Sequence, residues 1–173
     1  MTDMHPTSRA AHGEHTDHGT PRSATSITPF LVVSPAAEAI TFYTEVLGAR
    51  LVDRTDLPAP GGEPLVAHAV LDFGRGLLQL GDPNPAYHLV AAPAGEDDCY
   101  SVGLYCDDVD AVVERAVAAG AELREPVTDF VSGDRYASIR DPFGVRWSVM
   151  TRVEDLSDEE SARRVAEWAA SLT

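Results

Sequence analysis

The sequence predicts an α+β fold made of two βαβββ modules followed by a C-terminal helix. We expect the order of one strand, one helix and three strands over residues 27–92 and again over residues 98–153. The two helix-to-strand joints, "FYTEVLGARL" and "RAVAAGAEL", share an apolar helix end, a glycine and a returning strand. The repeated order therefore predicts two copies of one structural unit.

The first module is expected to begin with the short apolar strand "ITPFLVV". A helix follows, with Ser34 as its N-cap and Gly48 just beyond its C-terminal end. The segment "ARLVDR" predicts the next strand, and "LVAHAVLDF" and "LLQLGD" predict two more, joined by the turn Gly74-Arg75-Gly76. These elements complete one βαβββ unit.

The second module repeats this order from the strand "CYSVGLYC" onward. Asp107 or Asp108 is expected to cap its helix, which Gly120 closes. The strand "AELREPVTDF" follows, and then the hairpin of "RYASIR" and "VRWSVMT" around the tight loop "DPFG". An amphipathic helix is expected last, at residues 157–172, because Ser157 and Glu160 match a capping box. Its apolar edge needs a surface to cover, either on the same chain or on a partner subunit.

The composition is strongly acidic. The chain has 173 residues, with 13 basic residues, all arginine, and 28 acidic ones, so its formal net charge is -15. This charge argues against binding to nucleic acid or to anionic membrane surfaces, which attract basic patches. Neutral and cationic small molecules remain suitable ligands, although a soluble and self-repelling surface is the simpler explanation of the charge.

The cysteines and the hydropathy predict a cytoplasmic protein. Cys99 and Cys106 lie about 23 Å apart if they share one extended strand, so they cannot form a disulfide bond with each other. The chain has no signal-like apolar stretch behind a basic start and no run of 18 apolar residues. Unpaired thiols fit a reducing compartment.

Residues 1–26 read as a disordered leader, because they are polar and lack apolar periodicity. Four of the six histidines lie in this leader: His5, His12, His15 and His18. We expect them to be a solvated tail, with capture of nickel or zinc as the alternative.

Three phrases together carry a family resemblance: "AEAITFYTEVLGARL", "DDVDAVVERAVAAGAEL" and "GDRYASIRDPFGVRWSV". With the repeated βαβββ order, they resemble the vicinal oxygen chelate superfamily, which holds glyoxalase I, bleomycin-resistance proteins and extradiol dioxygenases, and within it the PhnB-like proteins. The resemblance covers about residues 27–156. It implies mixed sheets that curl around a cavity, with strands that turn one face to the helices and the other to the cavity. It also implies a homodimer.

Metal-dependent members of this superfamily hold a divalent ion with four inward residues. The matching positions in this sequence are Thr28, Gln79, Ser101 and Ser148. Only Gln79 is an ordinary ligand, since serine and threonine hydroxyls are weak neutral donors. We therefore expect no metal and no other cofactor in a largely apolar cavity.

Other residues are candidates for contact with a small molecule in that cavity. His68 lies inside a core strand, but Val70 replaces a carboxylate that similar proteins carry beside it, so a structural histidine is the alternative. Arg135 and Tyr136 are expected at the cavity mouth, or otherwise as a surface pair of Asp134 with Arg135 and a packed Tyr136. Alternation places Ala137, Ile139, Ser148 and Met150 on the cavity face. The predicted ligand-binding set is Thr28, Phe30, His68, Gln79, Ser101, Arg135, Tyr136, Ser148 and Met150.

Three functions remain open, and no catalytic residue is assigned. The first is a metal-independent protein of the sequestration or resistance type, which binds a small organic ligand, cationic or aromatic. The second is a lyase or isomerase that uses His68, Arg135 or Tyr136, or a displaced metal site. The third is a regulatory or interaction module that depends on the terminal helix and the leader.

Overall fold

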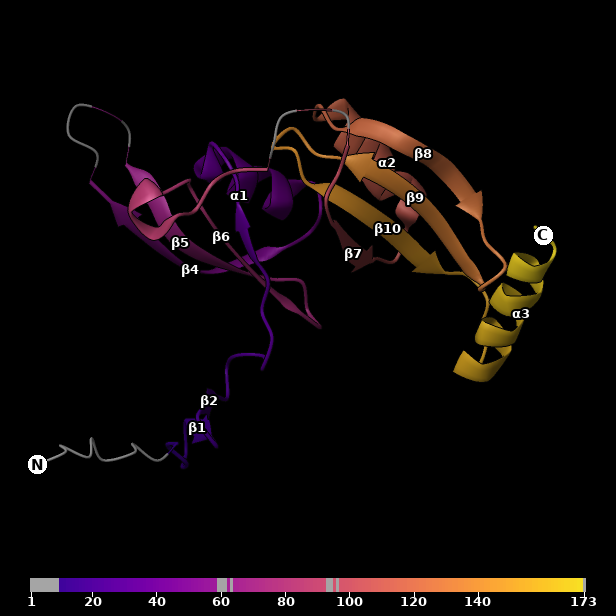
Figure 1. The fold of residues 1–173 in the computed structure, drawn as a ribbon, viewed down its shortest axis with the longest axis horizontal. Coiled ribbons are helices and arrows are strands. Elements are labelled where there is room, and N and C mark those ends of the chain that lie inside the picture. The colour runs from indigo at the N-terminus through magenta and orange to yellow at the C-terminus, as the bar shows by residue number, and fades with distance from the viewer. Residues whose placement is uncertain (1–9, 59–61, 63, 93–94, 96, 173) are drawn as a thin grey trace, which may run out of the picture.

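The computed structural model describes residues 10–58, 62, 64–92, 95 and 97–172, and it confirms the α+β fold of two βαβββ modules (Figure 1). The first module contains β3 (Phe30–Val32), α1 (Ala36–Glu45), β4 (Arg50–Leu57), β5 (Leu65–Asp72) and β6 (Leu77–Gly81). The second contains β7 (Ser101–Tyr105), α2 (Val109–Ala118), β8 (Glu122–Asp129), β9 (Asp134–Arg140) and β10 (Arg146–Arg152). A single-turn helix, η1 (Pro85–Tyr87), lies in the connection between them.

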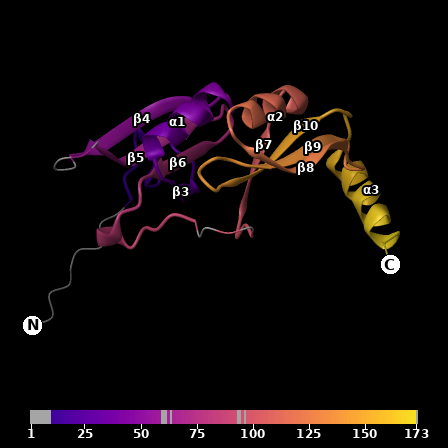
Figure 2. The ribbon, with the colours of Figure 1, turned by 90° about the horizontal axis from the view of Figure 1, so that it is seen from above.

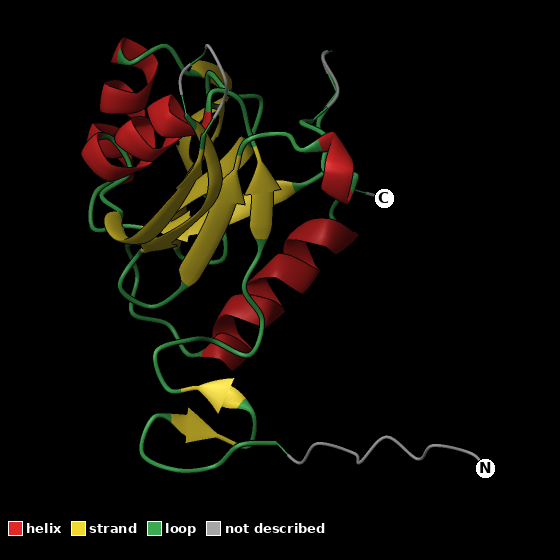
Figure 3. Ribbon diagram, turned by 90° about the vertical axis from the view of Figure 1, so that its left-hand side faces the viewer, coloured by secondary structure: helices red, strands yellow, loops and turns green. Residues whose placement is uncertain are grey.

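Each module forms a four-stranded mixed sheet. The strand orders are β3-β6-β5-β4 and β7-β10-β9-β8, with the first pair of each sheet parallel and the other pairs antiparallel. Both α1 and α2 cover the same side of the two sheets, which lie next to each other along the molecule (Figures 2 and 3). Among the described residues, no helix of the same module lies on the opposite face of each sheet, which is called here the open face.

The helix ends show how local sequence sets the boundaries. Asp108 caps α2, because its carboxylate accepts a hydrogen bond from the Ala111 N–H at 3.0 Å. The prediction that Ser34 caps α1 is wrong. The first N–H of α1, on Ala36, donates instead to the carboxylate of Asp82 at 3.0 Å, so a residue 46 positions away performs this task. Sequence periodicity cannot show such a distant cap.

The core lies between the helices and the sheets, and it joins the two modules. The ring of Tyr43 on α1 is fully buried and stands 5.2 Å from the ring of Trp147 on β10. Phe42 of the same helix packs edge-on against Phe143 of the β9–β10 turn, with ring centroids 6.1 Å apart. The helix of the first module thus packs on the last hairpin of the second, and this contact fixes how the modules meet.

The C-terminal helix α3 (Asp158–Ala170) lies against its own chain (Figure 1). Ser157 caps it as predicted, with its hydroxyl accepting from the Glu160 N–H at 3.2 Å. The Trp168 ring packs edge-on against Phe130 at 5.0 Å, and the Ser161 hydroxyl donates to a backbone carbonyl of the second module. Trp168 stays 40% exposed, so this contact covers only part of the apolar edge.

The described part of the leader contains a short hairpin of β1 (Thr16–Asp17) and β2 (Thr20–Pro21), where the sequence predicts disorder. Its turn, His18-Gly19, has a positive φ at both residues, which is the geometry of a tight two-residue hairpin turn. Residues 1–9, including His5, lie outside the described part of the chain. None of the helices that the structure describes has the length and apolarity that crossing a bilayer requires.

Candidate functional site

Two of the four positions predicted to match the metal ligands of the superfamily lie side by side. Ser101 on β7 and Ser148 on β10 share a hydrogen bond, with 2.8 Å between their Oγ atoms. Thr28, just before β3, shares a hydrogen bond of 2.8 Å with the hydroxyl of Thr25. The four positions offer three hydroxyls and one amide, and the hydroxyls already pair with neighbours. This donor set does not fit zinc, nickel or iron, which prefer imidazole, thiolate or carboxylate ligands.

The open face of the first sheet carries three of the predicted site residues. Phe30 on β3 pairs with Gln79 on β6, and the ring of Phe30 stands 6.1 Å from the ring of His68 on β5. His68 Nδ1 also lies 4.0 Å from Asp53 Oδ2 on β4, so the expectation that this histidine lacks a nearby carboxylate is wrong. Asp53 stands directly opposite Val70 across the strands. Pairing of distant strands therefore supplies the carboxylate that the local sequence omits.

The open face of the second sheet is more polar than the sequence predicts. The β9–β10 pairing places Ser138 opposite Ser148, so the neighbours of Ser138 point to the other face. These neighbours, Ala137 and Ile139, are completely buried against the helices, and their predicted place beside Ser148 and Met150 is wrong. A hydroxyl replaces the expected apolar side chain at the centre of this face.

Tyr136 lies on this open face, opposite Met150 of β10. A hydrogen bond between Tyr136 and Arg146 is the main cause that raises the pKa of that arginine above its ordinary value. The open face therefore combines hydroxyl groups with guanidinium groups, since Arg140 stands opposite Arg146 in the same strand pairing. The hydroxyls can donate hydrogen bonds to a polar part of a small molecule or accept them from it, and a guanidinium can donate them.

Arg135 does not join Tyr136 at a cavity mouth. Its guanidinium binds the carboxylate of Asp110 on α2, with distances of 2.6 Å from Nε and 2.8 Å from Nη2, and that of Asp129 at 2.8 Å. Adjacent strand residues point to opposite faces, so Arg135 reaches the helix side of the sheet while Tyr136 faces the open side. The expected pair with Asp134 is also absent, because Asp134 binds Arg152 at 2.8 Å.

Arg140 and Arg146 hold the connection between the modules against the second sheet. Arg140 Nε lies 3.3 Å from one oxygen of Asp98, and Arg146 Nη1 lies 3.9 Å from the other. Arg146 also pairs with Glu125 at 2.8 Å. The Asp98 side chain is only 7% exposed, so the pair is shielded from water.

Asp141, the first residue of the "DPFG" loop, is a buried carboxylate with four donors. Its Oδ2 accepts from the Tyr43 hydroxyl at 2.7 Å and from Trp147 Nε1 at 2.9 Å, while its Oδ1 accepts from the N–H groups of Phe143 and Val145. Burial raises the pKa of Asp141, and the four hydrogen bonds oppose this shift. Because all four partners donate, the ionised carboxylate fits them best. Asp141 therefore has a structural role: it ties α1 to β10.

A cavity of about 510 Å³ lies between the β5–β6 turn and strand β7, where the two modules meet. Its walls include none of the nine predicted site residues, but several of their chain neighbours. Gly103 connects the two regions, because it lines the cavity and pairs with Ser148 in the β7–β10 register. The walls are mostly apolar and aromatic and consist of Pro29, Phe73, Arg75, Gly76, Leu77, Leu78, Val102, Gly103, Leu104, Tyr105 and Trp147.

Comparison with known proteins agrees with this architecture. The family described as the Glyoxalase/Bleomycin resistance protein/Dioxygenase superfamily matches residues 23–149. An uncharacterized protein of Mycobacterium tuberculosis is 32% identical over 139 residues, which cover 78% of this chain and 79% of that protein.

Solved structures give the same result. TioX from Micromonospora sp. ML1 is 26% identical with a TM-score of 0.55, and the match covers 77% of this chain and all of TioX. The PhnB protein from Bacillus cereus is 22% identical with a TM-score of 0.57, over 73% of this chain and 99% of that one, a likeness that concerns the fold alone.

Proposed function

Because the chain belongs to the Glyoxalase/Bleomycin resistance protein/Dioxygenase superfamily, we propose that it binds a small organic molecule without a metal ion at the four family positions. The observation that carries this proposal is the apolar, aromatic cavity of about 510 Å³ between the modules. A volume of this size accommodates a drug-sized ligand. The function would be sequestration, as in the resistance branch of the superfamily.

The expected ligand is neutral or cationic and contains an aromatic group. Phe73 and Tyr105 line the cavity and offer ring faces for stacking or for a cation, while the buried Trp147 ring backs the same wall. The net charge of -15 favours the approach of cations over anions. The linked hydroxyls of Ser101 and Ser148 stand beside Gly103 and could bind one polar group of the ligand.

A binding experiment tests this proposal. A panel of neutral and cationic aromatic compounds is screened by thermal shift with untagged, metal-depleted protein, and hits are measured by calorimetry. Gly103→Leu is the blocking variant, because Gly103 lines the cavity. The variant should still fold, because a Cβ at this position meets only the flexible end of Met150 at 3.6 Å. The matched control is Val90→Leu, at a residue that is 76% exposed in the connection between the modules.

We expect metal-depleted wild type and Val90→Leu to bind equally, and Gly103→Leu to lose at least about ten-fold in affinity, or about 1.4 kcal/mol. Binding that requires an added divalent ion and disappears in Gln79→Ala would contradict the metal-free proposal. Equal affinity in Gly103→Leu would show that the ligand does not occupy this cavity.

We also propose that a second copy of the chain covers the open faces. Both α1 and α2 lie on one side of the sheets (Figures 2 and 3). They therefore leave both open faces uncovered: the face with Phe30 and His68 in the first sheet and the face with Tyr136 in the second. Light scattering on the full chain tests this point. A monomeric mass at micromolar concentration would contradict it.

The contact of His68 with Asp53 favours a second candidate, a lyase or isomerase. A carboxylate near Nδ1 can orient an imidazole so that Nε2 accepts a proton from a substrate. The test is turnover of any ligand found by the screen, measured with wild type and His68→Gln. Turnover that His68→Gln abolishes while binding persists would favour the enzyme over the binding protein.

A further inference from the structure

The β1–β2 hairpin gives part of the leader a defined conformation. The Gly19 N–H donates to the Ala11 carbonyl and the Gly13 N–H to the Thr16 carbonyl, both at 2.8 Å. The two turn residues, His18 and Gly19, have φ values of 44° and 87°. This left-handed geometry reverses the chain sharply, and it returns the His18 side chain toward the strand that precedes it.

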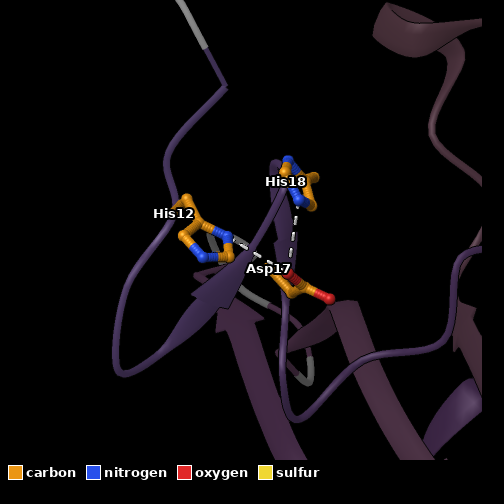
Figure 4. Close-up of side chains that lie close together, drawn as sticks. All are labelled: His12, Asp17 and His18. Atoms are coloured by element: carbon orange, nitrogen blue, oxygen red, sulfur yellow. Dashed lines mark ion pairs between the residues drawn. The ribbon is translucent and has the colours of Figure 1, made fainter.

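Three side chains of this hairpin converge on one point (Figure 4). His12 Nδ1 lies 3.1 Å from Asp17 Oδ1, and His18 Nε2 lies 3.9 Å from the same oxygen. The two imidazole rings stand 4.6 Å apart, centroid to centroid, and are tilted by 37°. One ligand atom from each of the three residues lies within 4.8 Å of the other two.

The spacing is close to that of a metal site. Nitrogen and oxygen ligands bind zinc at about 2.0–2.1 Å, so two of them stand about 3.3 Å apart in a tetrahedral site. The separation of His12 from Asp17 already matches this value, and His18 needs only a small side-chain rotation. An ion pair alone explains the cluster less well. In that case two imidazoles share one carboxylate oxygen, although the side chains of His12 and His18 are 57% and 85% exposed. Ion pairs between exposed groups contribute little to stability.

We propose that the β1–β2 hairpin binds one divalent transition-metal ion of the zinc, nickel and copper class through His12 Nδ1, Asp17 Oδ1 and His18 Nε2. Two neutral imidazoles and one carboxylate are ligands that suit these ions. Water completes the coordination, because all three residues are exposed. The negative net charge of the chain favours the approach of the cation.

Metal binding also stabilises the hairpin. His12 lies five positions before Asp17, at the end of β1, and six before His18, in the turn, so the ion closes a loop that otherwise depends on a few backbone hydrogen bonds. The site lies in the leader, before β3, and uses none of the residues that line the cavity between the modules. It therefore represents a binding function separate from the proposed ligand cavity.

Calorimetric titration of the untagged full chain with zinc chloride tests this proposal. We expect one zinc per chain, and a loss of at least about ten-fold in affinity for each of His12→Ala, Asp17→Asn and His18→Ala. The matched control is His15→Ala, a histidine of the same hairpin segment whose side chain is 87% exposed and lies 4.0 Å from Glu14. This control should retain wild-type affinity within about two-fold.

A second measurement covers the case in which a variant loses the hairpin itself. Asp17→Asn keeps the size of the side chain, and imidazole NMR signals of the zinc-loaded wild type should shift for His12 and His18 but not for His15. If His15→Ala lost as much affinity as the three ligand variants, or if all variants bound zinc as the wild type does, the proposal would be overturned. Gln79→Ala should leave the zinc affinity unchanged, which separates this site from the four family positions.

Discussion

The hydrogen bond between Tyr43 and Asp141 offers a quantitative test of how the modules are joined. Tyr43→Phe removes one of four donors from a carboxylate that is only 4% exposed, and leaves the aromatic packing in place. A hydrogen bond to a charged group contributes about 1.5–3 kcal/mol, so we expect the free energy of unfolding to fall by about 2 kcal/mol. For a chain of this length, that loss lowers the melting temperature by about 4–8 °C.

Urea and thermal unfolding, followed by circular dichroism at pH 7, measure this effect. Tyr87→Phe is the matched control, since its ring is 73% exposed, and it should melt within about 1 °C of the wild type. The effect of Tyr43→Phe should shrink at acidic pH. Burial raises the pKa of Asp141 in the folded state, so ionising this carboxyl lowers the stability of the fold as pH rises above the ordinary pKa of 3.8. The hydrogen bond from Tyr43 reduces this loss, and it therefore matters most when Asp141 is ionised. A Tyr43→Phe protein with wild-type stability at pH 7 would refute the reasoning.

Two further predictions concern backbone space and surface charge. Gly81→Ala should destabilise the fold by about 1–3 kcal/mol in the same unfolding assay, because its Cβ would stand 2.8 Å from the Ala67 carbonyl oxygen; Gly76→Ala, with open space around it, is the control. The pKa of Glu160 is lowered from 4.5 to about 2 by hydrogen bonds from two arginines of α3, so its stabilisation of that helix is complete above pH 4.5 and is lost as pH falls toward 2. Trp168 fluorescence should report the loosening of α3 at low pH. The change in fluorescence between pH 4.5 and 2 should be smaller in 1 M salt or in Glu160→Gln, because both remove the ion pairs of Glu160. An identical acid transition in Glu160→Gln would contradict the assignment.

The fold could be predicted from the sequence because its elements have strong local signals. Apolar periodicity, the glycines after both main helices and the "DPFG" loop each restrict a short segment, and the two modules repeat the same order. Gly48 and Gly120 have positive φ values of 80° and 97°, as helix-ending glycines require. Element type and order are thus local properties of this chain.

The candidate site could be predicted only in part, because it depends on register and on distant pairs. Alternation within each strand does not show whether Ala137 and Ser148 lie on the same face of the sheet. The antiparallel pairing of β9 with β10 shows that they lie on opposite faces. The carboxylate near His68 comes from Asp53, which is 15 positions away and on another strand. The helix-end glycines and the hairpin predict the four family positions, and a hydrogen bond joins two of those positions, Ser101 and Ser148.

The hairpin around "DPFG" joins structure to the proposed function through Trp147. Its indole N–H donates to Asp141, and its ring packs on Tyr43 and forms part of the cavity wall. The position of that wall therefore depends on the buried carboxylate that holds the two modules together. The polar groups that meet at Asp141 act within the fold, and the rings and backbone around them shape the cavity. A ligand in the cavity would accordingly contact both modules and would stabilise their junction together with Asp141.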